Sequence, residues 1–159
     1  MKSILSPLIG KDNPLTLQHS ARTAVAAVVS LLVARWFGLP ESYWAAVTTL
    51  VVMQSTLGAA LPVSAQRLAG TALGAAAGAL AGTYYPGNAL VFGACILVLG
   101  IVFVPFRLVR NAYRYAGITL SITMLVPGHS GRIVALHRFF EVSVGITVGL
   151  ALSALWPER

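Results

Sequence analysis

Charged residues are scarce in this sequence, and those that fall within apolar stretches are the first candidates for chemistry. Glu141 is the only acidic residue inside such a stretch, because Asp12, Glu41 and Glu158 fall in predicted loops or tails. A charge buried among apolar side chains is costly and by default suggests function, so Glu141 is a candidate for proton coupling. Arg138 precedes it by one helical turn, and the alternative is that the two side chains form a structural ion pair.

Basic and amide side chains in the other apolar stretches are candidates for binding an anion. Arg22 lies early in the first stretch, Gln54 past the middle of the second, and Arg67 at the start of the third. Arg114 lies near the start of the fifth. The alternative for the three arginines is that they lie at a membrane surface, where long basic side chains reach toward lipid headgroups.

Sequence motifs of catalysis and metal binding are missing. The sequence contains neither a G-x-x-x-x-G-K-[ST] phosphate loop nor a G-x-S-x-G nucleophile motif. His129 and His137 have no acidic or thiol companion at ligand spacing, which argues against a metal site. Cys95 is a lone cysteine, expected to be a small buried hydrophobic residue. The sequence therefore predicts a protein that is not an enzyme and needs no cofactor or metal.

Glycines recur at every fourth residue in the third stretch and again, more briefly, in the last. The two series are Gly70, Gly74, Gly78 and Gly82, and Gly145 and Gly149 continuing from Glu141 toward Ser153. Small residues let helices approach closely in lipid, where burial of apolar surface gives little driving force. We therefore expect the third and sixth helices to pack with close backbones and Glu141 to face that packing. A surface on which helices slide during transport is the alternative.

Prolines and composition define the elements that carry these residues. The chain has 159 residues, of which 57% are hydrophobic and 9% charged, too few charged residues for a soluble domain. Seven prolines bracket six apolar stretches, each about 27 Å long as a helix, close to the hydrocarbon core of about 30 Å. The stretches are 20–37, 43–61, 68–85, 89–105, 108–126 and 139–156. The sequence predicts an all-α integral membrane protein, a bundle of six transmembrane helices, rather than a membrane β-barrel.

The distribution of positive charge predicts the orientation of this bundle. Eight of the eleven Lys and Arg residues fall on the side of the termini and three on the other. The positive-inside rule then places both termini in the cytoplasm, with a cytoplasmic N-terminal segment at 1–19, the membrane domain at 20–156 and a short tail at 157–159. Scattered basic residues do not form a basic face, so no nucleic-acid partner is expected.

Three segments resemble a known family. Arg22 at the start of the first helix, GLPESYWAAVTTLVVMQSTLGA at 38–59 and RLAGTALGAAAG at 67–78 are similar to the membrane domain of the fusaric acid resistance family, within the aromatic acid exporter superfamily. The similarity is strong over 20–82 and looser beyond. It implies a multi-pass protein of the bacterial inner membrane that exports aromatic carboxylates or similar small anions. It also implies two six-helix halves, so we expect this single half to form a homodimer or pair with a second six-helix subunit.

The sequence thus predicts a transporter half for a small organic anion. Arg22, Arg67 and Arg114 would attract the anion past Gln54, and a proton gradient coupled through Glu141 would drive export. One alternative is a non-transporting membrane scaffold that assembles other proteins, in which these charges tolerate neutral substitution. The other is a passive anion channel, whose flux does not depend on a proton gradient. The identity of the substrate is not encoded.

Overall fold

The computed structural model describes residues 17–54, 56–104, 110–126 and 130–157, and these contain six α-helices and no strand. Most of the predicted N-terminal segment, His129 and the last two residues lie outside the described part. The helices are α1 (Leu17–Trp36), α2 (Tyr43–Val52), α3 (Leu57–Tyr84), α4 (Ala89–Phe103), α5 (Arg110–Leu125) and α6 (Gly131–Leu155). The prediction of an all-helical fold is confirmed.

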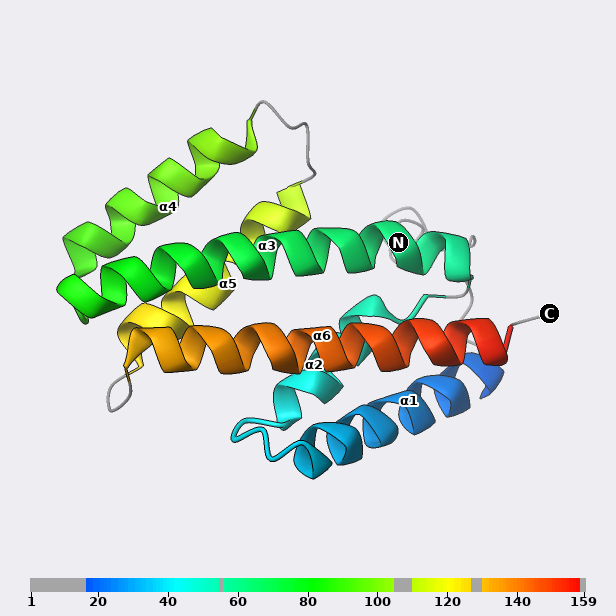
Figure 1. Ribbon diagram of the computed structural model, residues 1–159. Helices are drawn as coiled ribbons and strands as arrows, with labels where there is room; N and C mark the ends of the chain where they lie inside the picture. The colour runs from blue at the N-terminus through cyan, green and yellow to red at the C-terminus, as the bar shows by residue number, and fades with distance from the viewer. Residues whose placement is uncertain (1–16, 55, 105–109, 127–129, 158–159) are drawn as a thin grey trace, which may run out of the picture.

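The two longest helices, α3 and α6, lie side by side and run in opposite directions (Figure 1). The start of α6 lies against the end of α3, because a Cβ atom built at Gly131 would be 3.3 Å from the carbonyl oxygen of Gly78. The α1–α2 hairpin packs along the second half of α6, and the α4–α5 hairpin packs along the second half of α3 (Figure 1). Two long helices thus form the centre, with one hairpin at each end.

Helix contacts follow the pattern of an internal repeat. The set of helix pairs in contact stays the same when α1, α2 and α3 are exchanged with α4, α5 and α6. Apart from the contact between α3 and α6 themselves, the most extensive contacts join α3 to α5 and α6 to α2, so each long helix packs on the shorter second helix of the other half. Because α3 and α6 are antiparallel, the halves α1–α3 and α4–α6 form an inverted repeat, an arrangement common in transporters.

The residues at the contacts between the halves repeat as well. Each long helix contains an arginine, and the residues 3, 7, 11 and 15 positions after it form a series on the helix. All of these residues are small except one, a glutamate in α6. The matched series are Arg67, Gly70, Gly74, Gly78 and Gly82 in α3, and Arg138, Glu141, Gly145, Gly149 and Ser153 in α6. The facing helices match too, with WAAVT at 44–48 in α2 and YAGIT at 115–119 in α5.

The glycine series face these two shorter helices. A Cβ atom at Gly74 would collide with the backbone of Ala116 in α5, and one at Gly145 would collide with the carbonyl oxygen of Ala45 in α2. The prediction that α3 and α6 pack closely is confirmed, but most glycines of the two series face α5 and α2 instead of each other. Alanine and threonine on α2 and α5 leave room for close backbones, whereas α3 and α6 approach closely where Gly131 meets the end of α3.

The predicted second helix, 43–61, is broken in the structure. Helix α2 ends at Val52, Met53 is extended, and α3 begins at Leu57, where the Thr56 hydroxyl accepts a hydrogen bond from the backbone nitrogen of Ala59 at 3.2 Å. The ten residues of α2 extend only about 15 Å, half of the hydrocarbon thickness of about 30 Å. Helix α3 consequently starts well before the predicted residue 68 and carries Pro62 inside it.

Two of the described helices are long and apolar enough to cross a membrane, namely α1 and α6. Helices α2 and α4 are apolar but shorter. The predicted last helix, 139–156, starts earlier than expected, at Gly131, so that Arg138 and Glu141 lie inside α6 rather than near its beginning. Proline positions therefore indicated the number of helices but not their lengths.

Candidate functional site

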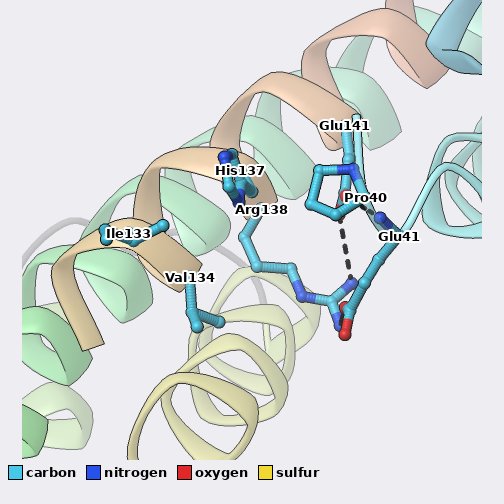
Figure 2. Close-up of a pocket in the computed structure, with 7 residues that line it drawn as sticks. All are labelled: Pro40, Glu41, Ile133, Val134, His137, Arg138 and Glu141. Atoms are coloured by element: carbon cyan, nitrogen blue, oxygen red, sulfur yellow. Dashed lines mark hydrogen bonds and ion pairs between the residues drawn. The ribbon is translucent and has the colours of Figure 1, made fainter. Parts of the chain in front are cut away.

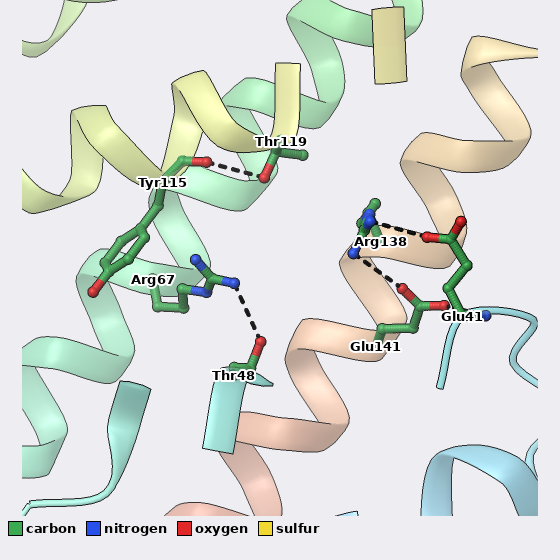
Figure 3. A network of polar contacts seen from close by, with 7 residues as sticks. All are labelled: Glu41, Thr48, Arg67, Tyr115, Thr119, Arg138 and Glu141. Atoms are coloured by element: carbon green, nitrogen blue, oxygen red, sulfur yellow. Dashed lines mark hydrogen bonds and ion pairs between the residues drawn. The ribbon is translucent and has the colours of Figure 1, made fainter. Parts of the chain in front are cut away.

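Arg67 brings together helices of both halves. Its side chain projects from α3, is only 4% exposed, and donates a hydrogen bond from Nη2 to the Thr48 hydroxyl of α2 at 3.4 Å. Its guanidinium lies over the Tyr115 ring of α5, 4.6 Å from the ring centroid (Figure 3). Within the part of the chain that the structure describes, no carboxylate pairs with Arg67. Arg67 is therefore a buried positive charge whose recorded contacts are a hydroxyl and an aromatic ring.

Polar atoms without partners lie along the same face of α3. The hydroxyl oxygens of Ser64 and Thr71 and the Nε atom of Arg67 are all buried and make no hydrogen bond. Residues spaced by three and then four positions share one face of a helix. A buried polar group left unpaired costs about 1–3 kcal/mol, and in native proteins such a group needs a specific explanation. One explanation that fits three neighbouring groups is that they bind a polar ligand.

Arg138 occupies the matching position in α6 and has carboxylate partners. Its Nη2 atom lies 2.9 Å from Oε2 of Glu41, and its Nη1 atom lies 3.7 Å from Oε2 of Glu141. Its guanidinium lies over the Trp44 ring, 3.8 Å from the centroid. Oε1 of Glu141 accepts a hydrogen bond from the backbone nitrogen of Glu41 at 3.0 Å. Figure 3 shows Arg138 between the two carboxylates.

Arg67 and Arg138 occupy equivalent positions in the repeat, but only Arg138 has carboxylate partners among the described residues. Each lies over the aromatic residue that opens the matched segment of the facing helix, Tyr115 for Arg67 and Trp44 for Arg138. Three residues after its arginine, α6 has Glu141 where α3 has Gly70. A Cβ atom at Gly70 would collide with the carbonyl oxygen of Ala112, so close packing against α5 prevents a carboxylate there. Among the described residues, the site at Arg67 therefore lacks the counter-charge that Arg138 has.

The remaining predicted residues lie elsewhere. Arg22 is fully buried and donates hydrogen bonds to the carbonyl oxygens of Gln54, after α2, and of Trp156, after α6, the latter at 3.0 Å. It thus holds the carboxyl ends of two helices, which carry unpaired carbonyls and negative dipole charge. Gln54 is half-buried beside it, and Arg114 is exposed. The structure brings Arg67, Arg138 and Glu141 to one region, places Arg22 with Gln54 in another, and leaves Arg114 outside both.

Several site residues were missed by inspection of the sequence. Glu41 was predicted to lie in a loop, and Trp44, Thr48 and Tyr115 were not predicted to be site residues, because each was considered within its own helix. The signal that identifies them is the match between WAAVT and YAGIT together with the match between the two arginine series. Aligning the two halves of the chain with each other would have revealed both matches.

Comparison with known proteins identifies the family of this chain. The family described as "Fusaric acid resistance protein-like" matches residues 16–152. The chain belongs to this family. The matched region contains both arginines and all of the residues that contact them. The candidate site is therefore part of the fusaric acid resistance-like domain itself. No solved structure matches the chain.

Two relatives extend the comparison of this fusaric acid resistance-like chain. Inner membrane protein YeeA of Escherichia coli (strain K12) is 28% identical over 89% of this chain and 41% of its own length. Aluminum-activated malate transporter 14 of Arabidopsis thaliana is 27% identical over 98% of this chain and 32% of its own length. The chain therefore spans less than half of either relative. Neither relative is named as an enzyme.

Proposed function

We propose that this protein is half of an inner-membrane transporter for small organic anions, with aromatic carboxylates as the substrate class. Membership of the fusaric acid resistance-like family supports a membrane role, and one relative is named as an inner membrane protein and another as a malate transporter. We further propose that the six helices form the membrane domain with both termini in the cytoplasm, as the distribution of basic residues along the sequence predicts.

The observation that carries this proposal is the buried charge of Arg67, which no carboxylate among the described residues neutralises. A guanidinium in an apolar region is expensive unless it is paired. The carboxylate of a substrate would supply the missing negative charge and accept hydrogen bonds from the hydroxyls of Ser64 and Thr71, which have no partner among the described residues. The Tyr115 ring beside Arg67 offers an apolar surface for an aromatic substrate.

Substitution of Arg67 tests the proposal directly. We expect Arg67→Gln to lower the rate of transport of labelled benzoate in membrane vesicles by about tenfold or more, because a hydrogen bond to a charged group contributes about 1.5–3 kcal/mol. Arg114→Gln is the matched control, since it removes the same charge from an exposed position. It should leave the rate within about twofold of the parent.

Two outcomes would favour other functions. Equal transport by the Arg67→Gln variant and the parent, at equal expression, would contradict the proposed anion site and favour a membrane scaffold. Undiminished transport after collapse of the proton gradient would favour a passive channel and remove the proposed role of Glu141 in proton coupling.

We propose that transport requires two copies of this chain or one copy and a second six-helix subunit. The family resemblance implies paired six-helix halves, and α2 covers only about half of the hydrocarbon thickness. Counting protomers in lipid nanodiscs, with benzoate binding measured on the same sample, tests this proposal. Benzoate transport by strictly monomeric protein in liposomes would contradict it.

A further inference from the structure

We infer that Arg138 forms a second carboxylate-binding site, at which the side chain of Glu41 is an internal ligand that an external monocarboxylate can displace. Glu41 belongs to the connection between α1 and α2, whereas Arg138 belongs to α6. The inference rests on contacts at Arg138 and does not depend on the transport role proposed for Arg67.

A small cavity lies directly beside this ion pair. Its volume is about 110 Å³, and Figure 2 shows its lining by the α1–α2 connection and by successive turns of α6. The lining residues are Pro40, Glu41, Ile133, Val134, His137, Arg138 and Glu141. A cavity of about 150 Å³ is enough to hold benzene, so this smaller one suits a short aliphatic acid. The positive charge of Arg138 and apolar walls from Pro40, Ile133 and Val134 match a carboxylate with a short hydrocarbon tail.

Of the two carboxylates near Arg138, Glu41 is the one that can be displaced. Its side chain is 39% exposed and makes a single 2.9 Å contact with Arg138. Glu141 is fully buried, lies 3.7 Å from Arg138, and accepts a hydrogen bond from the Glu41 backbone, which secures the connection. Because water reaches the Glu41 end of this pair, releasing that carboxylate costs less than separating a pair that is buried at both ends. An external carboxylate therefore competes mainly with the high local concentration of a tethered group.

The other groups around Arg138 are compatible with exchange of one carboxylate for another. Trp44 stacks on the Arg138 guanidinium, and Tyr43 interacts with it electrostatically. The Nε atom of Arg138 is buried and has no hydrogen-bond partner among the described residues. Arginine has five N–H donors in a planar fork that can bind a carboxylate through two of them. The arrangement at Arg138 also shows how a carboxylate binds an arginine at this position of the repeat.

Propionate is the appropriate probe, because it reproduces the CH₂–CH₂–carboxylate side chain of glutamate as a free molecule. The experiment compares the parent with Glu41→Ala, purified in the same mild detergent, by thermal unfolding at increasing propionate and constant ionic strength. We expect propionate to raise the Tm of Glu41→Ala with a half-maximal concentration at least about tenfold below that of the parent. Propionamide, which has the same shape without the charge, should raise neither Tm.

Two further measurements make the result decisive. A variant carrying Arg138→Gln and Glu141→Gln, which removes the cation together with its buried counter-charge, should lose the propionate response. Arg67→Gln should retain it, which separates this site from the proposed transport site. The inference is overturned if Glu41→Ala responds no better than the parent, if propionamide is as effective as propionate, or if Arg67→Gln alone abolishes the response. If Glu41→Ala does not fold, Glu41→Gln provides the same comparison.

Discussion

The halves α1–α3 and α4–α6 place an arginine at the same position of the same packing arrangement but surround it differently. In α6 the arginine is neutralised by Glu141 and by Glu41, whereas in α3 the matching arginine meets Thr48 and Tyr115. The repeat thus presents one arginine that two carboxylates of the chain neutralise and one that no described carboxylate neutralises. The comparison teaches that an internal ion pair in one half can indicate a ligand site in the other.

The largest expected effect is a difference in stability between the two arginines. Arg138→Gln should lower the free energy of unfolding by about 3–5 kcal/mol, because it leaves the fully buried Glu141 without its positive partner. Arg67→Gln should be neutral or stabilising, because it removes a buried charge that no described carboxylate pairs with. Chemical denaturation of both variants in one mild detergent measures the difference.

A double variant controls for the loss of side-chain shape. Adding Glu141→Gln to Arg138→Gln removes the uncompensated negative charge, so part of the lost stability should return. Equal losses of unfolding free energy for Arg67→Gln and Arg138→Gln would show that the two arginines are neutralised alike and would contradict the proposed difference between the halves.

The sequence allowed an all-helical fold and the number of helices to be predicted, because long apolar stretches separated by proline are typical of helices in membrane proteins. It did not reveal the break after Val52, where neither glycine nor proline occurs. The available signal was Thr56, a residue type favoured at helix N-caps. Pro62 was taken as a helix end, yet it lies within α3, where its ring is exposed and one backbone hydrogen bond is lost.

The candidate site was only partly predictable, for a different physical reason. Arg67, Arg138 and Glu141 were identifiable because charge is rare and costly in apolar surroundings. The roles of Glu41 and Thr48 depend on which helices pack together. The pairing of α3 with α5 and of α6 with α2 depends on close backbone contacts between the two halves. Arg22 was taken as an anion contact, but its position beside two helix ends depends on the break in α2 and the end of α6.

Glycine substitutions give the next largest expected effect. Gly74→Ala and Gly145→Ala should each cost about 1–3 kcal/mol, because the added methyl groups collide with the backbones of Ala116 and Ala45 respectively. Alanine has the higher helix propensity, so any loss must come from contacts between helices. The loss should be similar in the two halves if the repeat packs in the same way on both sides, and thermal unfolding in a single detergent measures it.

Gly149 provides a matched control within α6. A Cβ atom there would lie 3.5 Å from Cγ1 of Val52, an ordinary contact. Gly149→Ala should therefore be neutral or stabilise the protein by up to about 1 kcal/mol. Its counterpart Gly78 would collide with the Thr123 side chain, so Gly78→Ala should be destabilising. A destabilised Gly149→Ala would show that α2 and α6 pack more closely than the structure indicates.

The smallest expected effects come from the two aromatic rings beneath the arginines. Trp44→Leu and Tyr115→Leu each remove a cation–π contact while keeping an apolar side chain, which should cost about 0.5–2 kcal/mol of stability in either half.

The two substitutions should differ in their effect on transport. Tyr115 touches the arginine proposed to bind substrate, so Tyr115→Leu should weaken benzoate transport, and Tyr115→Phe should restore most of it because the ring is kept. Trp44 touches the arginine that Glu41 and Glu141 already neutralise, so Trp44→Leu should change transport in proportion to the amount of folded protein only. Benzoate transport divided by the quantity of folded protein is the quantity to compare. A specific loss in Trp44→Leu, with Tyr115→Leu unaffected, would reverse the roles assigned to the two halves and make Arg138 the transport site.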